Sequence, residues 1–161
     1  MPKLSAGLLL YRFAPEGAEV LLVHPGGPFW ARKDDGAWSI PKGEYIEGED
    51  PWTVAQREFL EELGKTAPDG PRVEFAPVKQ PGGKVVTAFG VCGDLDLDGT
   101  FSNTFTLEWP KGSGNVREYP EVDRAGWFLL AQARSKLLKG QLPLLDRLSD
   151  VLEAGEPGGS R

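Results

Sequence analysis

The chain has 161 residues, of which 40% are hydrophobic and 26% charged, enough for one globular domain with a substantial core. Its net charge of −6 excludes a surface that coats nucleic acid, because no basic stripe is available to neutralise phosphates. The single cysteine excludes a disulfide within the chain.

The first residues, MPKLSAGLLLYRF, contain a short apolar run without a small-residue cleavage site. We interpret this run as a strand rather than a signal peptide. No run in the sequence reaches the roughly 18 apolar residues that are needed to span a bilayer. We therefore expect a soluble cytoplasmic protein, a monomer or homodimer, with no membrane partner and with nucleic acid disfavoured as a partner.

The N-terminal part of the chain predicts a hairpin followed by irregular segments. Residues 3–13 and 18–25 are apolar runs separated by APEG, which is a turn signal. Residues 26–37 form a loop that begins with glycines and carries aromatic and cationic side chains. Residues 38–50 are interrupted by proline and glycine, so they cannot hold regular structure for long.

A helix is predicted over residues 51–63. Asp50 is a suitable N-cap, Pro51 a suitable first helical residue, and Gly64 a natural terminator. One stripe of the helix is apolar, which predicts that this stripe packs on the core. Its members are Trp52, Ala55, Phe59 and Leu63.

Three carboxylates, Glu58, Glu61 and Glu62, share a neighbouring stripe of this helix. Each like-charge pair at i, i+3 or i, i+4 costs about 0.2–0.5 kcal/mol. Two of them also lie in the last turn, where the helix dipole favours cations. Such a costly arrangement indicates a function, although a solvated acidic helix face is the alternative.

The C-terminal half predicts a second hairpin, further strands and two helices. A hairpin around PGG is expected from 72–80 and 84–95, strands from 104–110 and 126–130, and helices from 131–138 and 141–154. This mixture indicates an α/β or α+β sandwich. We expect a single domain over residues 1–152 and a flexible tail over 153–161.

Read outward from the helix, the fixed residues form a longer pattern. Gly43, Glu49 and the run Arg57–Gly64 (REFLEELG) follow one another at fixed spacings. This pattern resembles the Nudix box, the signature of hydrolases that act on nucleoside diphosphates linked to another moiety. The one departure is Lys65, where the family pattern has an apolar residue. The resemblance implies the Nudix-type α/β/α sandwich, built on a mixed sheet, over residues 3–150.

Three glutamates on one side of a helix offer the hard oxygen ligands that Mg²⁺ prefers. The resemblance implies that Glu61 and Glu62 are the central ligands of Mg²⁺, for which Mn²⁺ is a possible substitute. It also implies that Glu58 is a further ligand or the group that orients or deprotonates water, and that the Gly43 carbonyl contributes to the metal site. Arg57 is expected to act in catalysis mainly by holding Glu49 or Glu61 in place.

The family often recruits another carboxylate from outside the box. Glu121 precedes Trp127 by six residues, a spacing that resembles the family's late glutamate, so we expect Glu121 to be a metal ligand. Glu118 or a purely surface role are the alternatives. The acidic run 94–98 lacks the glycine and distal glutamate of an EF-hand, and we interpret it as a solvated turn.

Substrate contacts are expected from lysines near the box and from the 26–37 loop. The candidates are Lys42, with Lys79 and Lys84, as phosphate contacts, and Trp30, Arg32 and Lys33, with Phe29, for stacking on a base and meeting outer phosphates. For the loop aromatics, packing is the alternative. His24 is interpreted as structural and Cys92 as a small core residue.

The predicted function is Mg²⁺-dependent hydrolysis of a phosphoanhydride by attack of water on phosphorus. The PKG entry to the box resembles dinucleoside polyphosphate hydrolases and predicted nucleoside triphosphate pyrophosphohydrolases, so these two substrate classes rank first. Nucleotide sugars, 5′-capped or triphosphorylated RNA ends and inositol pyrophosphates follow. The alternatives are a Nudix-like module that senses a nucleotide without cleaving it, and an acidic interaction domain.

Overall fold

The computed structural model describes residues 3–154 of the chain. The strands are β1 (Leu4–Ala14), β2 (Gly17–Pro25), β3 (Lys42–Tyr45), β4 (Arg72–Glu74), β5 (Val78–Lys79), β6 (Val85–Cys92), β7 (Thr104–Glu108), β8 (Val116–Pro120) and β9 (Val122–Leu129). The helices are α1 (Pro51–Leu63), α2 (Leu130–Lys136) and α3 (Leu142–Glu153), with 3₁₀ turns at Pro81–Gly83 and Lys139–Gln141.

A mixed seven-stranded sheet is built around β1. The strand order is β4-β6-β1-β2-β9, with β3 also paired to β1 and β5 to β6. The β1–β6 pair is parallel, whereas β2 and β3 run antiparallel to β1. β3 pairs with the first residues of β1 and β2 with its last residues, so β2 and β3 diverge along the same edge. The chain before β3 lies between them, because the Leu8 N–H donates to the Pro41 carbonyl and Ser39 pairs with Val23 of β2.

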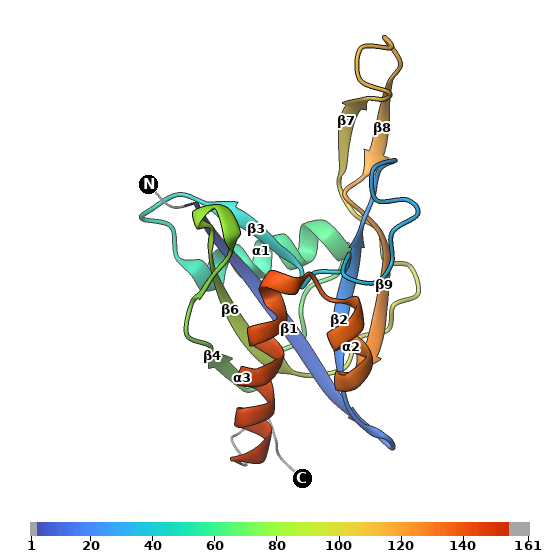
Figure 1. Cartoon of the computed structure of the whole chain (residues 1–161). Coiled ribbons are helices and arrows are strands. Elements are labelled where there is room, and N and C mark those ends of the chain that lie inside the picture. The colour runs from blue at the N-terminus through green and yellow to red at the C-terminus, as the bar shows by residue number, and fades with distance from the viewer. Residues whose placement is uncertain (1–2, 155–161) are drawn as a thin grey trace.

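Each face of the sheet has its own core, as the alternation of side chains along a strand requires. In β1, Leu8 and Leu10 pack on one face with Val54, Ala55 and Phe59 of α1 and its neighbours. Leu9 and Tyr11 pack on the other face with residues of α2 and α3. Figure 1 shows α2 and α3 on one side of the sheet and α1 on the other. The predicted α/β/α sandwich is confirmed.

Helix α1 begins and ends where its sequence predicts. The Asp50 carboxylate accepts from the Thr53 N–H, and Gly64 adopts φ 72°, the left-handed conformation that favours glycine. The buried stripe includes Val54 as well as the predicted positions, while Trp52 is only partly buried at its edge. The helix is therefore held against the sheet by a wider apolar face than the predicted stripe.

Two predictions for the later strands are wrong. The expected strand 72–80 is divided into β4 and β5, because Pro77 lies between them and cannot donate to a strand ladder. Both fragments still pair antiparallel with β6, so the predicted hairpin is present in interrupted form. The strand β8 was not predicted at all. It pairs with β7 in a separate two-stranded sheet, and Figure 1 shows this ribbon projecting beyond the end of the main sheet.

The remaining predictions agree with the structure within a few residues. β9 begins four residues earlier than expected, and α2 and α3 match the predicted helices, with Pro143 in the first turn of α3. Of the expected tail, residue 153 ends α3 and residues 155–161 lie outside the described residues. None of the described helices is long and apolar enough to cross a membrane.

Candidate active site

The last two turns of α1 carry Glu58, Glu61 and Glu62. Residues 101–103, which we call the strap, run beside the end of this helix. The N–H groups of Phe101 and Asn103 donate to the carbonyls of Leu63 and Glu61, at 3.0 and 2.9 Å. These bonds satisfy carbonyls that a helix C-terminus otherwise leaves unpaired. The strap therefore fixes the end of the helix that carries the carboxylates.

Strand β3 runs close to the same carboxylates. A Cβ atom at Gly43 would lie 2.1 Å from Cδ of Glu58, so no other residue fits at this position without displacing the carboxylate. This close approach places the Gly43 backbone next to the acidic side chains of α1. It gives a steric reason for a glycine at this position of β3.

A fourth carboxylate, Glu121, joins this group from the junction of β8 and β9. Its N–H donates to the Asn103 carbonyl at 2.8 Å, and its own carbonyl accepts from the Gly26 N–H at 2.9 Å. The strap that caps α1 therefore also positions Glu121. Glu121 lines the same pocket as Glu62, the last glutamate of α1.

The convergence of these carboxylates changes their protonation. Burial, followed by repulsion from Glu58 and Glu121, raises the pKa of Glu62 from 4.5 to about 8. Burial and the charge of Glu61 raise the pKa of Glu58, and the same two causes raise the pKa of Glu121. Without a cation, Glu62 therefore retains at neutral pH a proton that an isolated carboxylate would release.

Arg57 lies between the box carboxylates, as expected. Its guanidinium donates to Glu49 at 3.4 Å and lies 3.7 Å from Glu58 and 3.9 Å from Glu61. Glu49 in turn accepts a hydrogen bond from the Ile46 N–H at 3.0 Å. This bond and, to a smaller extent, the contact with Arg57 lower the pKa of Glu49. Arg57 thus connects the loop before α1 to the helix.

A pocket of about 220 Å³, which we call the carboxylate pocket, is lined by residues of β2, β3, α1 and the segment between β2 and β3. Trp30, Lys42, Glu62 and Glu121 are among the residues that line it. Burial and, next, the nearby charge of Lys84 lower the pKa of Lys42. A cationic side chain and two carboxylates thus share one partly enclosed space.

The other predicted substrate contacts are distributed differently. Arg32 and Lys33 are exposed on the 26–37 loop, outside the pocket lining, and Lys33 Nζ lies 4.0 Å from the centre of the Phe29 ring. Lys79 is exposed on β5 and also lies outside the lining. Lys84 does not line the pocket but is close enough to Lys42 to affect its titration.

The two residues interpreted as structural are indeed buried or partly buried. His24 is fully buried, and its ring nitrogens contact Asp123 Oδ1 at 2.8 Å and the Lys33 carbonyl at 2.6 Å. These contacts attach the 26–37 loop to β9. Cys92 is partly buried at the end of β6, where it packs against the core on the α3 side.

The donor chemistry of the site fits a hard divalent cation. Glu62 and Glu121 line one pocket and Glu58 packs against the Gly43 backbone, so carboxylate and carbonyl oxygens lie near one another. Within residues 3–154, no three Asp, Glu, His or Cys side chains already stand in a metal-binding cluster. Mg²⁺ needs only one or two carboxylates together with substrate phosphates and waters, so the donor set is sufficient for it.

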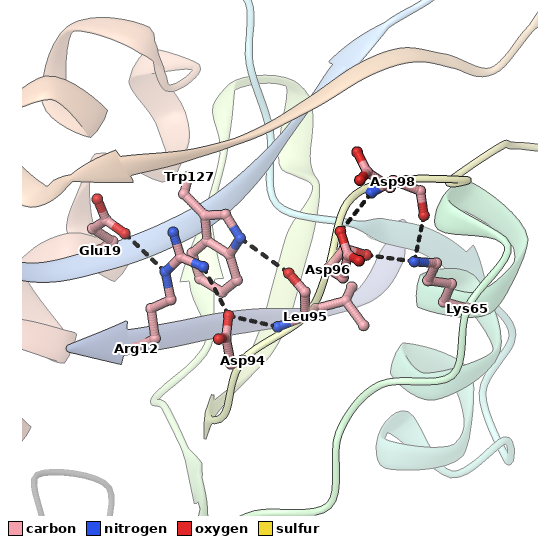
Figure 2. A network of polar contacts seen from close by, with 8 residues as sticks. All are labelled: Arg12, Glu19, Lys65, Asp94, Leu95, Asp96, Asp98 and Trp127. Atoms are coloured by element: carbon pink, nitrogen blue, oxygen red, sulfur yellow. Dashed lines mark hydrogen bonds and ion pairs between the residues drawn. The ribbon is translucent and has the colours of Figure 1, made fainter. Parts of the chain in front are cut away.

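Lys65, the departure from the family pattern, has a specific partner. Figure 2 shows its ammonium directed at the 94–98 turn, where it donates to the carbonyls of Asp96 and Asp98 at 2.5 and 2.6 Å. Arg12 and Trp127 hold the other end of the turn through Asp94 and the Leu95 carbonyl. The 94–98 segment, interpreted from sequence as a solvated turn, is therefore attached to the end of α1.

Lys65→Met is expected to lower the free energy of unfolding by about 1–2 kcal/mol, because two hydrogen bonds from a charged donor at a partly exposed site are lost. Chemical denaturation of the wild type and the variant measures this difference. Lys111→Met, at an exposed position in the turn between β7 and β8, is the matched control. Equal stability of the two variants would show that the Lys65 contacts do not stabilise the fold.

Sequence reasoning missed Phe105 and Leu107, which lie beside the predicted candidates Phe29, Trp30 and Glu121. A pocket of about 430 Å³, which we call the aromatic pocket, is lined by residues 25–30, Phe105, Leu107 and Glu121. Phe105 and Leu107 are apolar and are separated by one polar residue, a pattern that predicts a strand with one apolar face. The partner of that face, a loop 75 residues earlier in the chain at Trp30, could not be inferred from spacing.

Comparisons with known proteins agree with the fold and with the motif. The model of the NUDIX domain matches residues 1–148. An RNA pyrophosphohydrolase of Rhodospirillum rubrum is 44% identical over 66 residues, which are 39% of this chain and only 38% of the relative. A Nudix hydrolase of M. smegmatis is 28% identical, with a TM-score of 0.57, over 93% of this chain and 85% of that one.

Two further solved structures share the fold at lower identity. A C. elegans Ap4A hydrolase in a binary complex is 23% identical, with a TM-score of 0.61, over 93% of this chain and 98% of that one. The NUDIX domain of Shewanella oneidensis NrtR, complexed with ADP ribose, is 17% identical, with a TM-score of 0.65, over 94% and 89% of the two chains.

Proposed function

This chain belongs to the Nudix family, and from that premise we propose that it hydrolyses a phosphoanhydride bond in a nucleoside polyphosphate with the help of a divalent metal ion. The observation that carries the proposal is that Glu62 and Glu121 line one pocket with Lys42, while Glu58 packs against Gly43 of the strand that carries Lys42. Such a cluster is unfavourable by itself and becomes favourable when a cation and an anionic substrate enter together.

Glu58, Glu61, Glu62, Glu121 and the Gly43 carbonyl would hold Mg²⁺, with Mn²⁺ as a substitute. When bound, the ion would polarise phosphoryl oxygens and lower the pKa of an attacking water. Because the protein carries a net charge of −6, a cation also has to offset the charge of a polyphosphate before it enters.

The protein's own groups would position the reactants. Lys42, which lines the carboxylate pocket, would contact a phosphate, and its partial burial strengthens that contact. Glu58 would be a further metal ligand or the group that accepts the proton of the attacking water, the two roles that the family pattern allows. Arg57 would keep Glu58 and Glu61 in place.

On the substrate side, Trp30 would stack on a base at the rim of the pocket. Arg32 and Lys33, exposed on the same loop, would meet outer phosphates, and Lys84 would add positive charge near Lys42. Lys79, exposed on β5, would act only on a long substrate.

A dinucleoside polyphosphate or a nucleoside triphosphate is the proposed substrate. The similarity to an Ap4A hydrolase and to an RNA pyrophosphohydrolase supports this class. The net negative charge of the protein favours a small nucleotide over an RNA end as the substrate, because a long polyanion needs several basic contacts.

The proposal is tested by a hydrolysis panel at mildly alkaline pH with Mg²⁺ and, in parallel, with a chelator. Dinucleoside polyphosphates, nucleoside triphosphates, nucleotide sugars and a triphosphorylated RNA oligonucleotide are supplied, and the products are separated by chromatography. We expect Mg²⁺-dependent turnover of the first two classes. Binding of nucleotides without turnover of any of them would indicate a sensing module instead, and it would contradict the proposal.

A further inference from the structure

The aromatic pocket lies next to the carboxylate pocket and shares residues with it. Pro25, Trp30 and Glu121 line both spaces. A single ligand can therefore place its phosphates beside Lys42 and Glu62 and another part of itself in the aromatic pocket. Its volume of about 430 Å³ is within the usual range for small-molecule sites, roughly 300–1,000 Å³.

The two walls of this pocket come from distant parts of the chain. Phe29 and Trp30 form one wall, and their rings meet edge to face at 5.1 Å between centroids. Phe105 and Leu107 form the other wall, because alternate residues of β7 point to the same side. Phe105 is further supported by Tyr119, its partner in the ribbon, at 6.0 Å.

Two glycines bring the walls together. A Cβ atom at Gly26 would lie 1.9 Å from the Pro120 carbonyl oxygen, and one at Gly27 would lie 2.9 Å from the Phe105 ring. Gly27 also has φ 97°, a conformation that other residues rarely adopt. The loop and the ribbon are thus in direct contact at the two glycines, which also line the pocket.

The lining is apolar except for Glu121, and Phe29 is 52% exposed although it is a large apolar side chain. Phe29 therefore offers apolar surface to a ligand at the pocket. Flat aromatic walls suit a flat aromatic ligand, and stacking tolerates every base because each has a π face.

We infer that the aromatic pocket binds a nucleobase of the substrate, so that the β7–β8 ribbon favours polyphosphates that carry a base over those that do not. The inference rests on the proposed function for the identity of the phosphates that occupy the carboxylate pocket. It assigns Phe105 and Leu107 to base binding and expects little discrimination between bases, because stacking supplies most of the contact.

The test compares two ligands that differ in whether they carry bases. Calorimetry with Mg²⁺ measures Kd for a methylene-bridged, non-hydrolysable diadenosine tetraphosphate and for inorganic tripolyphosphate. The ratio of the two Kd values isolates the contribution of the bases. In Phe105→Ala we expect the preference for the dinucleotide to fall about tenfold, as for the loss of one base–aromatic stack.

Three further variants make the result specific. Phe105→Tyr keeps an aromatic wall and is expected to retain the wild-type ratio. Leu107→Ala, on the same wall, is expected to lower the ratio by a smaller factor and replaces Phe105→Ala if that variant does not fold. Val116→Ala, exposed on β8 and absent from the pocket lining, is the control with an unchanged ratio.

Hydrolysis of natural diadenosine tetraphosphate by the wild type is measured separately. Turnover together with an unchanged ratio in both Phe105→Ala and Leu107→Ala would overturn the base subsite and leave the proposed function intact. A lowered ratio without any turnover would support the subsite and overturn the proposed function. Failure of the wild type to bind either ligand would overturn both.

Discussion

Replacement of Glu62 by glutamine is expected to reduce Mg²⁺-dependent hydrolysis by at least about a hundredfold, the upper end of the loss seen when a group that only supports a metal ligand is removed. Glutamine matches the side chain in size, so the fold is expected to remain. It cannot carry the negative charge that Glu62 supplies to the carboxylate pocket. Steady-state kinetics over a range of Mg²⁺ concentrations measures the loss.

The matched control for this variant is Glu153→Gln, at an exposed position at the end of α3. It removes one negative charge from the protein without touching the site, and its activity is expected to equal that of the wild type. Near-normal activity of Glu62→Gln would remove Glu62 from the catalytic machinery and leave the raised pKa of this residue without a function.

The second large effect concerns the stability of the metal-free protein. In the folded state the pKa of Glu62 is raised from 4.5 to about 8, so the folded protein retains a proton that the unfolded chain releases. The free energy of unfolding therefore falls as the pH rises from about 4.5 to about 8. Glu58 and Glu121, whose pKa values are also raised, act in the same direction.

Glu62→Gln removes the largest part of this pH dependence. The quantity of interest is the free energy of unfolding of the variant minus that of the wild type, measured with a chelator present. We expect this difference to be larger at pH 8 than at pH 5 by on the order of 2–4 kcal/mol. Denaturation curves at both pH values measure the difference. Added Mg²⁺ should raise the stability of the wild type at pH 8 and affect the variant less. A difference that does not change with pH would show that Glu62 titrates normally.

The parts of the fold that the sequence predicts best are those with local determinants. Helix α1 has its N-cap, its first-turn proline and its terminal glycine within the segment itself, and its bounds are as predicted. The ribbon strand β8 has no such signal. Its residues are mostly exposed, so it lacks the contrast between a buried and a solvated face by which strands are recognised.

The candidate site shows the same division. The glutamates of the box are neighbours on one helix, so their common face follows from the helical repeat alone. Phe105 and Trp30, by contrast, are brought together by the close contact of Gly26 and Gly27 with the ribbon. Likewise, the partners of Lys65 are backbone carbonyls 31 and 33 residues later in the chain. Every residue has a backbone carbonyl, so the sequence does not indicate which of them Lys65 contacts.

The account is tested most directly by hydrolysis in water enriched in ¹⁸O, with Mg²⁺ and the substrate that the panel selects. Mass spectrometry of the separated products locates the label. Attack of water on phosphorus predicts one ¹⁸O atom per turnover, bound to phosphorus in one of the two products. Label on a carbon of the nucleoside, or no turnover of any nucleoside polyphosphate, would contradict the proposed reaction.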